Sequence, residues 1–551
     1  MSTSRTDPPR LAVAFRVDGS ATIGTGHIMR CRTLADALAL RGISSVFLCR
    51  RLPAPLANLL AQSGHEIRAL PAEELPAPEP TNPYGTWLGT TEKHDAQCTV
   101  EALRKANGHR LLAIIVDHYG LQAEWEQQVS ARLAVPILAI DDLSRPHRAT
   151  AVLDTTFGKS DSDYIGQVPA DCRLMVGAQF ALLRPDFMRA RKAALQRRTD
   201  RHTAGLPAQD ILISMGGSDP EDLTGLIIDA LLPVADSFDL RLHALIGPAY
   251  PHAQRLDTQS AQAGFRLSIH RNVTDMATLL SRMDLCIGAS GSSSWERCCL
   301  GLPTINLTIA DNQRTIAAML VRAGAAVDGG QVSRIGADAS WTIAGLAPTA
   351  WAQRYVAPIV TDASRLSAIS TRAAEIVDGF GTLRVVAGLF AWLPPGLTVA
   401  LEPMQLSDAA ITHTWQCFPG VRRYSRSTEV PSWDQHLAWI ESKLNASSGS
   451  SLIRKITYGG IPAGVIRLDV TQAAQNCFPG NPNAREISIL VAPELQGRGI
   501  AAEAIMLLLR QAPGPVVACV LKENAASQRL FQKCGFVQLD PELFLYDPLA
   551  H

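Results

Sequence analysis

Short runs of β-branched and other apolar residues alternate with longer helical patterns through the first two thirds of the chain. The first such runs occupy residues 11–18, 45–50, 111–117 and 135–141. A helix is predicted from about His27 to Leu40, after the first run and a glycine-rich turn. Strands of a parallel sheet covered by helices on both faces are buried on both sides, so they read as continuous apolar runs. The pattern therefore predicts an α/β domain.

A polar, basic stretch at residues 189–209 interrupts this alternation of apolar runs and helical patterns, and we interpret it as a linker. The alternation then restarts, with apolar runs at residues 211–217, 241–247, 267–270, 284–289 and 304–309. Two α/β domains in tandem fit this arrangement better than one large sheet does.

A second boundary is predicted at Pro394-Pro395-Gly396. Beyond it, residues 453–469 and 485–493 have the pattern of antiparallel strands, with a hairpin turn at Tyr458-Gly459-Gly460. The predicted domains are residues 11–200, 208–393 and 396–551, and a chain of 551 residues is expected to divide in this way.

Composition excludes several classes of function. The chain has 51 Lys plus Arg and 51 Asp plus Glu, so no global field attracts it to nucleic acid or to an anionic membrane. Its longest uncharged stretch, residues 385–401, is divided by two prolines and is too short on either side to span a bilayer. The 11 cysteines form no CxxC pair, which is typical of thiols in a reducing compartment. We expect a cytoplasmic protein that binds a small molecule.

The first chemical cluster lies in residues 15–30, where Gly24 and Gly26 separate a strand from a helix. Glycines at such a turn let backbone N–H groups approach an anion at the helix N-terminus, although many such turns serve only tight packing. His27, in the first helical turn, is kept neutral by that position and is a candidate base, or else a capping or core histidine. Arg30 lies one turn later and could hold a phosphate or carboxylate.

A second cluster belongs to the second predicted domain. A glycine-rich turn at residues 214–220 is followed by a Gly-Ser run, Gly288 to Ser294, which opens a helix and offers amides and hydroxyls to a diphosphate. Glu296 is placed to accept hydrogen bonds from ribose hydroxyls, or else to complement the helix dipole. The amides of Asn312 and Gln313 suit sugar hydroxyls.

The second domain resembles the nucleotide-binding half of GT-B glycosyltransferases. More narrowly, residues 11–390 resemble the UDP-sugar hydrolases of pseudaminic acid biosynthesis. Six segments in order carry this resemblance: DGSATIGTGHIMR (18–30), VDHYGL (116–121), DDLSRP (141–146), LLRPDF (182–187), GGSDP (216–220) and SSSWERCCLGLP (292–303). The resemblance implies two Rossmann-like domains in a GT-B arrangement that hold a UDP-amino sugar between them.

The resemblance also implies roles for individual residues. His27 corresponds to the catalytic base of that family, which activates water and inverts the anomeric carbon. The positions implied to bind substrate are Asp18, Gly26, Arg30, Tyr119, Gly217, Val273, Ser290, Gly291, Ser292, Glu296, Asn312 and Gln313. No metal is expected, since the adjacent Asp141 and Asp142 point to opposite faces if they lie in a strand. Residues 152–158 lack the asparagines that we expect there, which leaves fine substrate contacts open.

In the third domain, residues 485–510 join a strand to a helix through Gln496-Gly497-Arg498-Gly499. Successive amides in such a turn suit the pyrophosphate of coenzyme A. The pattern Q-x-x-G-x-A and the helix at 524–536 resemble the acetyl-CoA signature of the GNAT acetyltransferases, which implies an α/β domain that uses acetyl-CoA. The implied coenzyme contacts are Val491, Gln496, Gly497, Arg498, Gly499, Ala501 and Asn524.

Glu486, at the start of the signature strand, is the candidate base of this domain, although an exposed strand carboxylate is an equal alternative. Many GNAT enzymes have a tyrosine acid where this chain has Phe531, so Tyr546 or solvent must protonate the thiolate instead.

Residues 415–440 resemble the N-terminal region of the pseudaminic acid acetyltransferase, which implies a fusion of consecutive steps: N-acetylation of a UDP-4-amino sugar, then hydrolysis to UDP and free sugar. Fusion raises the local concentration of the intermediate. Two alternatives remain open. In the first alternative, the first two domains form a GT-B glycosyltransferase. In the second, they form a non-catalytic nucleotide-sugar module attached to a protein acetyltransferase. The configuration of the sugar cannot be read from the residues.

Overall fold

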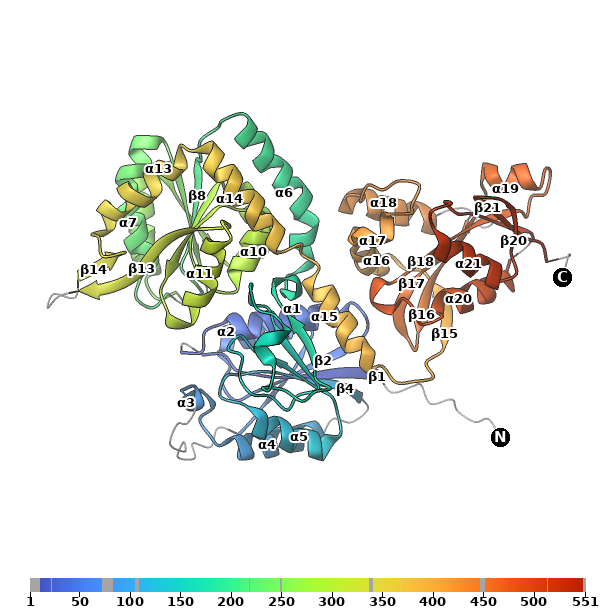
Figure 1. Cartoon of the computed structure of the whole chain (residues 1–551), viewed down its shortest axis with the longest axis horizontal. Coiled ribbons are helices and arrows are strands. Elements are labelled where there is room, and N and C mark those ends of the chain that lie inside the picture. Colours follow the sequence, from blue (N-terminus) through green and yellow to red (C-terminus); the bar gives the residue numbers. More distant parts are fainter. Residues whose placement is uncertain are drawn as a thin grey trace.

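The computed structural model describes residues 10–20, 22–71, 83–104, 109–217, 219–247, 250–335, 340–445, 451–512 and 514–548. Three seven-stranded sheets follow one another along the chain, each with its own helices (Figure 1). We call the parts built on the first and second sheets the first and second lobes, and the part built on the third sheet the C-terminal unit.

The first lobe is a parallel sheet with strand order β3-β2-β1-β4-β5-β6-β7. Its strands are β1 (Arg10–Val17), β2 (Ser44–Cys49), β3 (Glu66–Ala69), β4 (His109–Asp117), β5 (Ile137–Ile140), β6 (Ala151–Asp154) and β7 (Arg173–Val176). Its helices are α1 (Gly26–Ala39), α2 (Ala54–Gln62), α3 (Gly85–Leu88), α4 (Glu92–Arg104) and α5 (Ala123–Leu133). Successive residues of β1 point to opposite faces: Phe15 packs with α1 and α2, and Ala14 with α4 and α5.

The second lobe repeats this strand order as β10-β9-β8-β11-β12-β13-β14, with only the last pair antiparallel. Its strands are β8 (Asp210–Ser214), β9 (Arg241–Ile246), β10 (Leu267–Arg271), β11 (Leu285–Ala289), β12 (Thr304–Thr308), β13 (Val327–Ile335) and β14 (Ser340–Ile343). Its helices are α7 (Leu223–Phe238), α8 (Ala253–Ala263), α9 (Met276–Arg282), α10 (Ser293–Cys299), α11 (Arg314–Arg322), α12 (Pro348–Trp351), α13 (Ala357–Val360) and α14 (Ala363–Ile376). The two doubly wound lobes confirm the predicted fold class.

The strand order reverses between β1 and β4 in the first lobe, and between β8 and β11 in the second. Loops that leave the carboxyl ends of strands at such a switch point diverge and form a crevice, where ligands of doubly wound folds bind. Both predicted chemical clusters follow these strands, so the topology alone places them at ligand-binding positions.

Two helices differ from the simple tandem arrangement. The basic stretch 189–209, which the sequence analysis interprets as a linker, is mostly part of α6 (Pro185–Thr203). This helix packs against α9, α10 and α14 of the second lobe, because Phe187 and Ala194 give it an apolar face. Conversely, α15 (Gly381–Leu389) follows the second lobe in sequence but buries Val385 and Val386 in the core of the first lobe.

The C-terminal unit is a mostly antiparallel sheet of order β15-β16-β17-β18-β19-β21-β20. Its strands are β15 (Val399–Pro403), β16 (Ser451–Tyr458), β17 (Ile461–Asp469), β18 (Arg485–Val491), β19 (Val516–Cys519), β20 (Val537–Asp540) and β21 (Leu543–Tyr546). Its helices are α16 (Ala409–Cys417), α17 (Pro419–Arg422), α18 (Trp433–Leu444), α19 (Gln472–Cys477), α20 (Ile500–Leu509) and α21 (Ala525–Lys533). The predicted hairpin turn after Tyr458 is confirmed by the pairing of β16 with β17.

The C-terminal unit is joined to the first lobe by a buried ion pair. The Nε of Arg41, just after α1, donates to Glu494 Oε1 at 2.7 Å, and Trp415 Nε1 donates to the same oxygen at 3.1 Å. Glu494 lies in η8 (Pro493–Leu495), which packs against α15. The apolar cores of the first lobe and this unit are continuous through α15, so the unit is docked rather than tethered.

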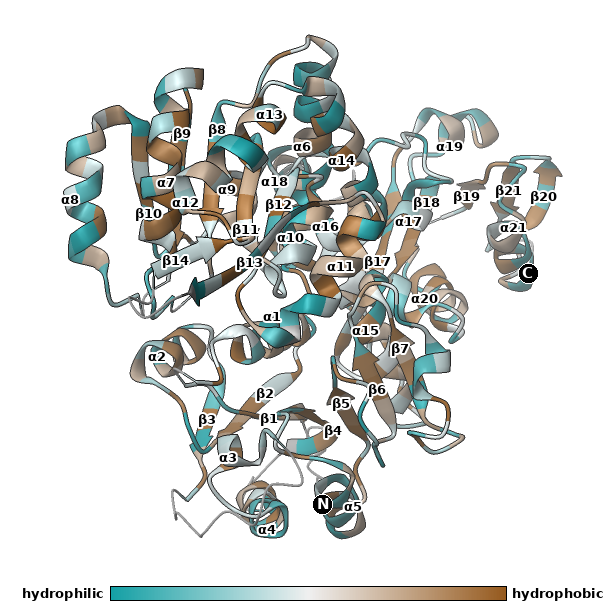
Figure 2. Ribbon diagram, turned by 60° about the vertical axis from the view of Figure 1, so that its left-hand side comes forward, coloured by the Kyte–Doolittle hydropathy of each residue, from teal (hydrophilic) through white to brown (hydrophobic). Residues whose placement is uncertain are grey.

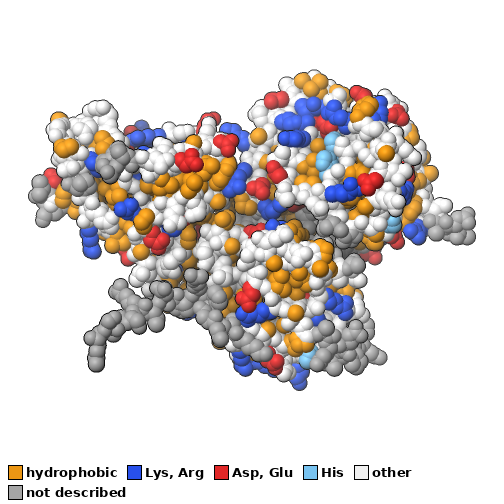
Figure 3. Space-filling view, turned by 180° about the vertical axis from the view of Figure 1, so that it is seen from behind, with side chains coloured by type: hydrophobic (Ala, Val, Ile, Leu, Met, Phe, Trp, Pro, Cys, Tyr) orange, Lys and Arg blue, Asp and Glu red, His pale blue; other side chains and the backbone are white. Residues whose placement is uncertain are grey.

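Strands such as β5, β6 and β11 are strongly apolar, as their buried positions require (Figure 2). Basic and acidic side chains are interspersed over the face seen in Figure 3, in keeping with the balanced charge. Among the described residues, no helix combines the length and apolarity needed to cross a bilayer.

Candidate functional site

The glycine-rich turns of the two lobes face each other. A Cβ built on Gly26, at the start of α1, would lie 3.7 Å from Ser292 Oγ of the second lobe. A Cβ built on Gly217, after β8, would lie 3.0 Å from Thr25 Oγ1 of the first lobe. These close approaches bring the two predicted clusters to one crevice between the lobes.

His27 is held at this crevice by a carboxylate from a neighbouring strand. Its Nδ1 lies 2.6 Å from Asp117 Oδ1, at the carboxyl end of β4. The residue is 9% exposed, and Nε2 has no hydrogen-bond partner among the described residues. When Nδ1 donates its proton to Asp117, the lone pair of Nε2 is left free to accept a proton. The pair therefore has the arrangement of a general base and its orienting carboxylate.

Asp117 is completely buried and remains a carboxylate. Burial alone would raise its pKa, but the guanidinium of Arg30 and the ring of His27 hold the pKa well below the usual aspartate range. Arg30 Nε donates to Asp117 Oδ2 at 2.7 Å, and its Nη1 donates to Asp142 Oδ2 at 2.6 Å. Arg30 was predicted to hold a substrate anion; in this structure its guanidinium is occupied by two protein carboxylates.

Tyr119 connects the same network to an aromatic wall. Its hydroxyl donates to Asp142 Oδ2 at 2.6 Å, and burial together with Asp142 raises the pKa of the phenol well above its usual value. The ring lies edge-on to His27, with centroids 4.8 Å apart, and stacks on Trp87 at 5.7 Å. With Tyr84, these rings form an apolar surface beside the imidazole.

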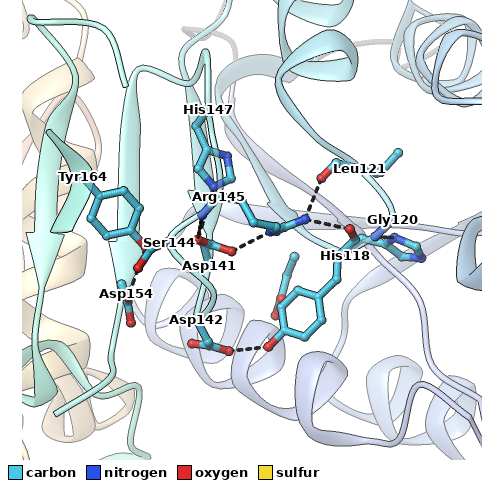
Figure 4. A network of polar contacts seen from close by, with 12 residues as sticks. His118, Gly120, Leu121, Asp141, Asp142, Ser144, Arg145, His147, Asp154 and Tyr164 are labelled. Carbon is cyan, nitrogen blue, oxygen red and sulfur yellow. Dashed lines mark hydrogen bonds and ion pairs between the residues drawn. The ribbon is translucent and has the colours of Figure 1, made fainter. Parts of the chain in front are cut away.

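A further layer of polar contacts supports the loop after β4 (Figure 4). Arg145 donates to Asp141 Oδ1 at 2.8 Å and, from Nη1, to the backbone oxygens of Tyr119 and Leu121. Tyr164 bridges Asp141 and Asp154, and burial and Asp142 raise the pKa of Asp154 to about 6. This layer fixes the backbone that carries Tyr119.

Asp141 and Asp142 lie just after β5, not in a strand as the prediction assumed, and they turn to different partners. Asp141 turns to Arg145 and Tyr164 (Figure 4). Asp142 turns to Arg30 and Tyr119. Within the described ranges, no group of three or more His, Cys, Asp or Glu side chains has the geometry of a metal site.

Asp18, predicted to bind substrate, has a carboxylate with no exposed surface. It pairs with Arg16 at 2.9 Å and accepts hydrogen bonds from the backbone N–H groups of Arg50 and Arg51. Asp18 therefore anchors the loop after β2 beneath the glycine-rich turn, and a direct ligand contact remains only a prediction.

The second lobe presents groups without protein partners. Ser290 Oγ is buried with no hydrogen-bond partner, and Ser292 is exposed without a side-chain capping bond to α10. The backbone N–H groups of Gly291 and Ser292 donate to no described residue, and a Cβ on Gly291 would meet only open space. The half-buried carboxylate of Glu296 has no hydrogen bond or ion pair among the described residues, and burial raises its pKa.

The remaining predicted contacts of this lobe lie in loops at the same side of the sheet. Val273 is half-buried between β10 and α9. Gln313, in η4 (Asp311–Gln313), accepts a hydrogen bond from the N–H of Ile309 through Oε1. The side chain of Asn312 lies outside the described residues.

In the C-terminal unit, strands β18 and β19 separate soon after they begin. They pair in parallel only at Arg485 and Glu486, although β18 continues to Val491. Glu486 stands at the point of divergence, is 6% exposed, and has one oxygen without a partner. Its other oxygen pairs with Arg426, whose side chain is largely exposed. A buried carboxylate beside a gap between strands is a suitable base for an amine that enters the gap.

The turn from β18 to α20 has the properties predicted for a coenzyme cradle. Gly497 and Gly499 have φ of +78° and +79°, which strongly favours glycine, and a Cβ on either would meet nothing within 4 Å. The backbone N–H groups of residues 496–499 donate to no described residue. Ala501 follows in the first turn of α20, and Val491 O lies 3.5 Å from Gln496 Nε2.

Two predicted positions of this unit are partly occupied by protein contacts. Arg498 Nη2 donates to Phe390 O at 2.8 Å, in η6 (Phe390–Trp392), which follows α15. Asn524 caps α21 by accepting from the N–H of Ser527. Phe531 is buried against Phe536, so this position presents no group to a thioester.

Sequence reasoning missed Asp117, Asp142, Trp87 and Tyr84 as parts of the first site. The signal for Asp117 was present, because an aspartate ends the apolar run next to the switch point. Trp87 and Tyr84 come from a short segment around α3 with no recognisable pattern, so only the fold brings them to His27.

Comparison with known proteins gives one family match and several relatives. Residues 398–537 match the family model described as Acetyltransferase (GNAT) domain, and from here on we call the C-terminal unit the acetyltransferase unit. The UDP-2,4-diacetamido-2,4,6-trideoxy-beta-L-altropyranose hydrolase of Campylobacter jejuni is 27% identical over 222 residues, which are 39% of this chain and 63% of the relative.

Two other relatives match over a longer stretch. Spore coat polysaccharide biosynthesis protein SpsG of Bacillus subtilis is 23% identical over 318 residues, covering 57% of this chain and 83% of that protein. An uncharacterized protein of Methanocaldococcus jannaschii is 20% identical over 310 residues, 55% of this chain and 57% of the relative. The chain thus spans less than two thirds of the archaeal protein and of the hydrolase. The chain combines a region similar to that hydrolase and to SpsG with a region, residues 398–537, that matches the acetyltransferase (GNAT) domain model.

Proposed function

We propose that the chain is a bifunctional enzyme of pseudaminic acid biosynthesis. The acetyltransferase unit acetylates the 4-amine of UDP-4-amino-4,6-dideoxy-N-acetyl-beta-L-altrosamine. The two lobes then hydrolyse the product, UDP-2,4-diacetamido-2,4,6-trideoxy-beta-L-altropyranose, to UDP and free sugar. The observation that carries the hydrolase is the His27–Asp117 pair, placed where the glycine-rich turn of the first lobe meets Ser292 of the second.

In the proposed hydrolysis, the second lobe binds UDP and the first lobe activates water. The free N–H groups of Gly291 and Ser292 suit a diphosphate, and the unpartnered carboxylate of Glu296 suits the ribose hydroxyls. His27 Nε2 takes a proton from water as its oxygen bonds to the anomeric carbon, and the bond to UDP breaks. Because UDP leaves readily as an anion, a base is needed more than an acid. A positioned base contributes roughly 10²–10⁴-fold.

Direct attack from the side opposite UDP inverts the anomeric centre and forms no covalent enzyme intermediate. Asp117 keeps His27 in the tautomer that exposes Nε2, and its low pKa ensures that it stays charged as the imidazolium forms. The Trp87 and Tyr119 rings shield this side of the crevice, which suits the apolar face of a deoxy sugar.

For the acetyltransferase step, acetyl-CoA as co-substrate supplies the activated acetyl group. The unpaired amides of residues 496–499 and the two open glycines fit its pyrophosphate, so the residues present suit the coenzyme. Glu486 accepts the proton of the sugar ammonium at the gap between β18 and β19. The ion pair between Arg426 and Glu486 has to break before that ammonium can bind to Glu486.

The test is UDP release by the purified full-length chain from the UDP-4-amino sugar, with and without acetyl-CoA and with no other acceptor. UDP release that depends on acetyl-CoA is expected, and Glu486→Gln should stop it while leaving hydrolysis of the pre-acetylated sugar nucleotide unchanged. If UDP appears only when a second sugar or protein acceptor is added, the lobes are a glycosyltransferase and the proposal is wrong.

A further inference from the structure

Arg297 is buried beneath the Gly-Ser turn of the second lobe. It lies in α10 and is 2% exposed. Its Nη1 donates to Ser293 Oγ at 3.0 Å, and its Nη2 donates to Ala289 O and Ser294 Oγ, each at 2.9 Å. The guanidinium is therefore fixed directly under the backbone that is predicted to face the diphosphate.

The charge of Arg297 has no carboxylate partner among the described residues, and its Nε has no hydrogen-bond partner. Two other buried arginines have carboxylate partners: Arg16 pairs with Asp18 and Asp95, and Arg41 pairs with Glu494. Arg198 is compensated differently, since it donates to carbonyls at the end of α9, where a helix carries partial negative charge. An isolated buried cation is costly, which points to an anion that is missing from the protein itself.

The surroundings of the guanidinium leave room for it but form no ion pair with it; the carboxylate of the preceding residue, Glu296, is near enough for its charge to be felt but makes no direct contact. A Cβ on Gly288 would lie 3.2 Å from Arg297 Nη1, so the glycine leaves room for the guanidinium. Asn306 is in register with Gly288 on the adjacent strand and therefore points to the same side of the sheet. Asn306 is 1% exposed, and both atoms of its amide lack partners. The adjacent strand therefore contributes a neutral amide, not a carboxylate, on this side of the sheet.

We propose that Arg297 is the buried positive charge that attracts the diphosphate of the sugar nucleotide to the second lobe. This inference rests on the proposed function, since it concerns the same nucleotide. Arg297 acts through the turn rather than by direct contact, because an unscreened charge in the interior is felt over several ångströms. It also donates to one lone pair of each hydroxyl of Ser293 and Ser294, so each hydroxyl keeps its proton to donate, in the proposed complex, to a phosphate oxygen.

The test compares the affinities of UDP, UMP and uridine for the full-length chain by isothermal titration calorimetry. Arg297→Gln should weaken UDP binding on the order of tenfold or more, UMP binding less, and uridine binding by no more than about twofold. Arg297→Lys, which keeps the charge, should retain most of the preference for UDP over uridine. Arg372→Gln, which removes an exposed arginine of α14, is the matched control and should change none of the three affinities.

A purely structural role for Arg297 predicts equal losses for UDP and uridine, and that result would overturn the inference. Asn306→Asp provides a second test if Arg297→Gln does not fold, because it places a negative charge beside an intact Arg297. It should lower the ratio of UDP to uridine affinity, and an unchanged ratio would contradict us. If the wild-type chain binds no UDP at all, the proposed function itself fails, which is a distinguishable outcome.

Discussion

The two lobes have the same strand order, but they differ in whether the charged and polar side chains at the crevice are paired with one another. In the first lobe, the charged groups around His27 are bound to one another: Asp117, Arg30, Asp142 and Tyr119 form a continuous set of short contacts. In the second lobe, the equivalent crevice edge presents Ser290, Ser292 and Glu296, none of which has a side-chain partner among the described residues.

This contrast separates two tasks that share one fold. A base must have a fixed position and a fixed tautomer, so its neighbours have to be satisfied before substrate arrives. A binding surface must instead keep its donors and acceptors unpaired, because groups that are already paired gain little from a ligand. In the proposed function, the topology sets where the two crevice edges lie, and the side chains organise one edge for chemistry and the other for recognition.

The largest effect on the rate is expected when the proposed base, His27, is removed. His27→Asn should lower the rate of UDP release by roughly 10²–10⁴-fold, because water loses its proton acceptor. The affinity for UDP, measured by calorimetry, should stay within about threefold of wild type, since the second lobe is unchanged. Undiminished UDP release would show that another group activates water.

A smaller effect is expected when the orientation of the base is disturbed. Asp117→Asn should reduce kcat by roughly 10²-fold, because an amide neither selects the Nδ1–H tautomer nor stabilises an imidazolium. The rate should also depend differently on pH, which a purely structural defect would not produce. A pH–rate profile of the same shape as wild type, merely scaled down, argues against this role.

The second lobe should show the reverse behaviour. Glu296→Gln should raise the Kd for UDP by about tenfold through loss of a charged acceptor, with kcat at saturating substrate little changed. Because burial raises the pKa of Glu296, UDP affinity of the wild type should begin to fall, as the pH is lowered, at a pH above the ordinary glutamate range. A large drop in kcat would mean that the lobes do not divide the tasks as we describe.

The smallest effect is expected on stability and concerns His147, a buried residue of the first lobe. Although burial alone would lower it, Asp141 and Glu126 raise the pKa of His147 to about 9. Because the pKa is higher in the folded chain, the protonated ring stabilises the fold. This contribution is fully present below the pKa of the unfolded chain, about 6.5, and is lost as the pH rises through the folded pKa of about 9. His147→Gln should therefore lower the Tm of the first unfolding transition more at pH 6 than at pH 9.5. The corresponding loss in the free energy of unfolding has an upper limit of roughly 3 kcal/mol. An equal Tm difference at both pH values contradicts a charged His147.

Much of the fold was predictable because its signals are local. The apolar runs that form β1, β4, β8 and β11 are buried on both faces, so no partner strand is needed to recognise them. The edge strands β3, β7 and β14 are short and partly exposed, and their residues have no distinctive pattern. The stretch 189–209 looked like a linker because its charged residues dominate the composition, whereas the few apolar positions that dock α6 decide its structure.

The sequence by itself determined which residues occupy the glycine-rich turns, the candidate bases His27 and Glu486, and the turn at residues 496–499, because each lies within a single strand–turn–helix segment. Only the tertiary structure decided that Asp117, 90 positions away, orients His27, that Gly26 faces Ser292, and that Arg498 binds the backbone after α15. These contacts depend on how separate segments pack, and packing is set by the burial of whole faces, which no local pattern specifies.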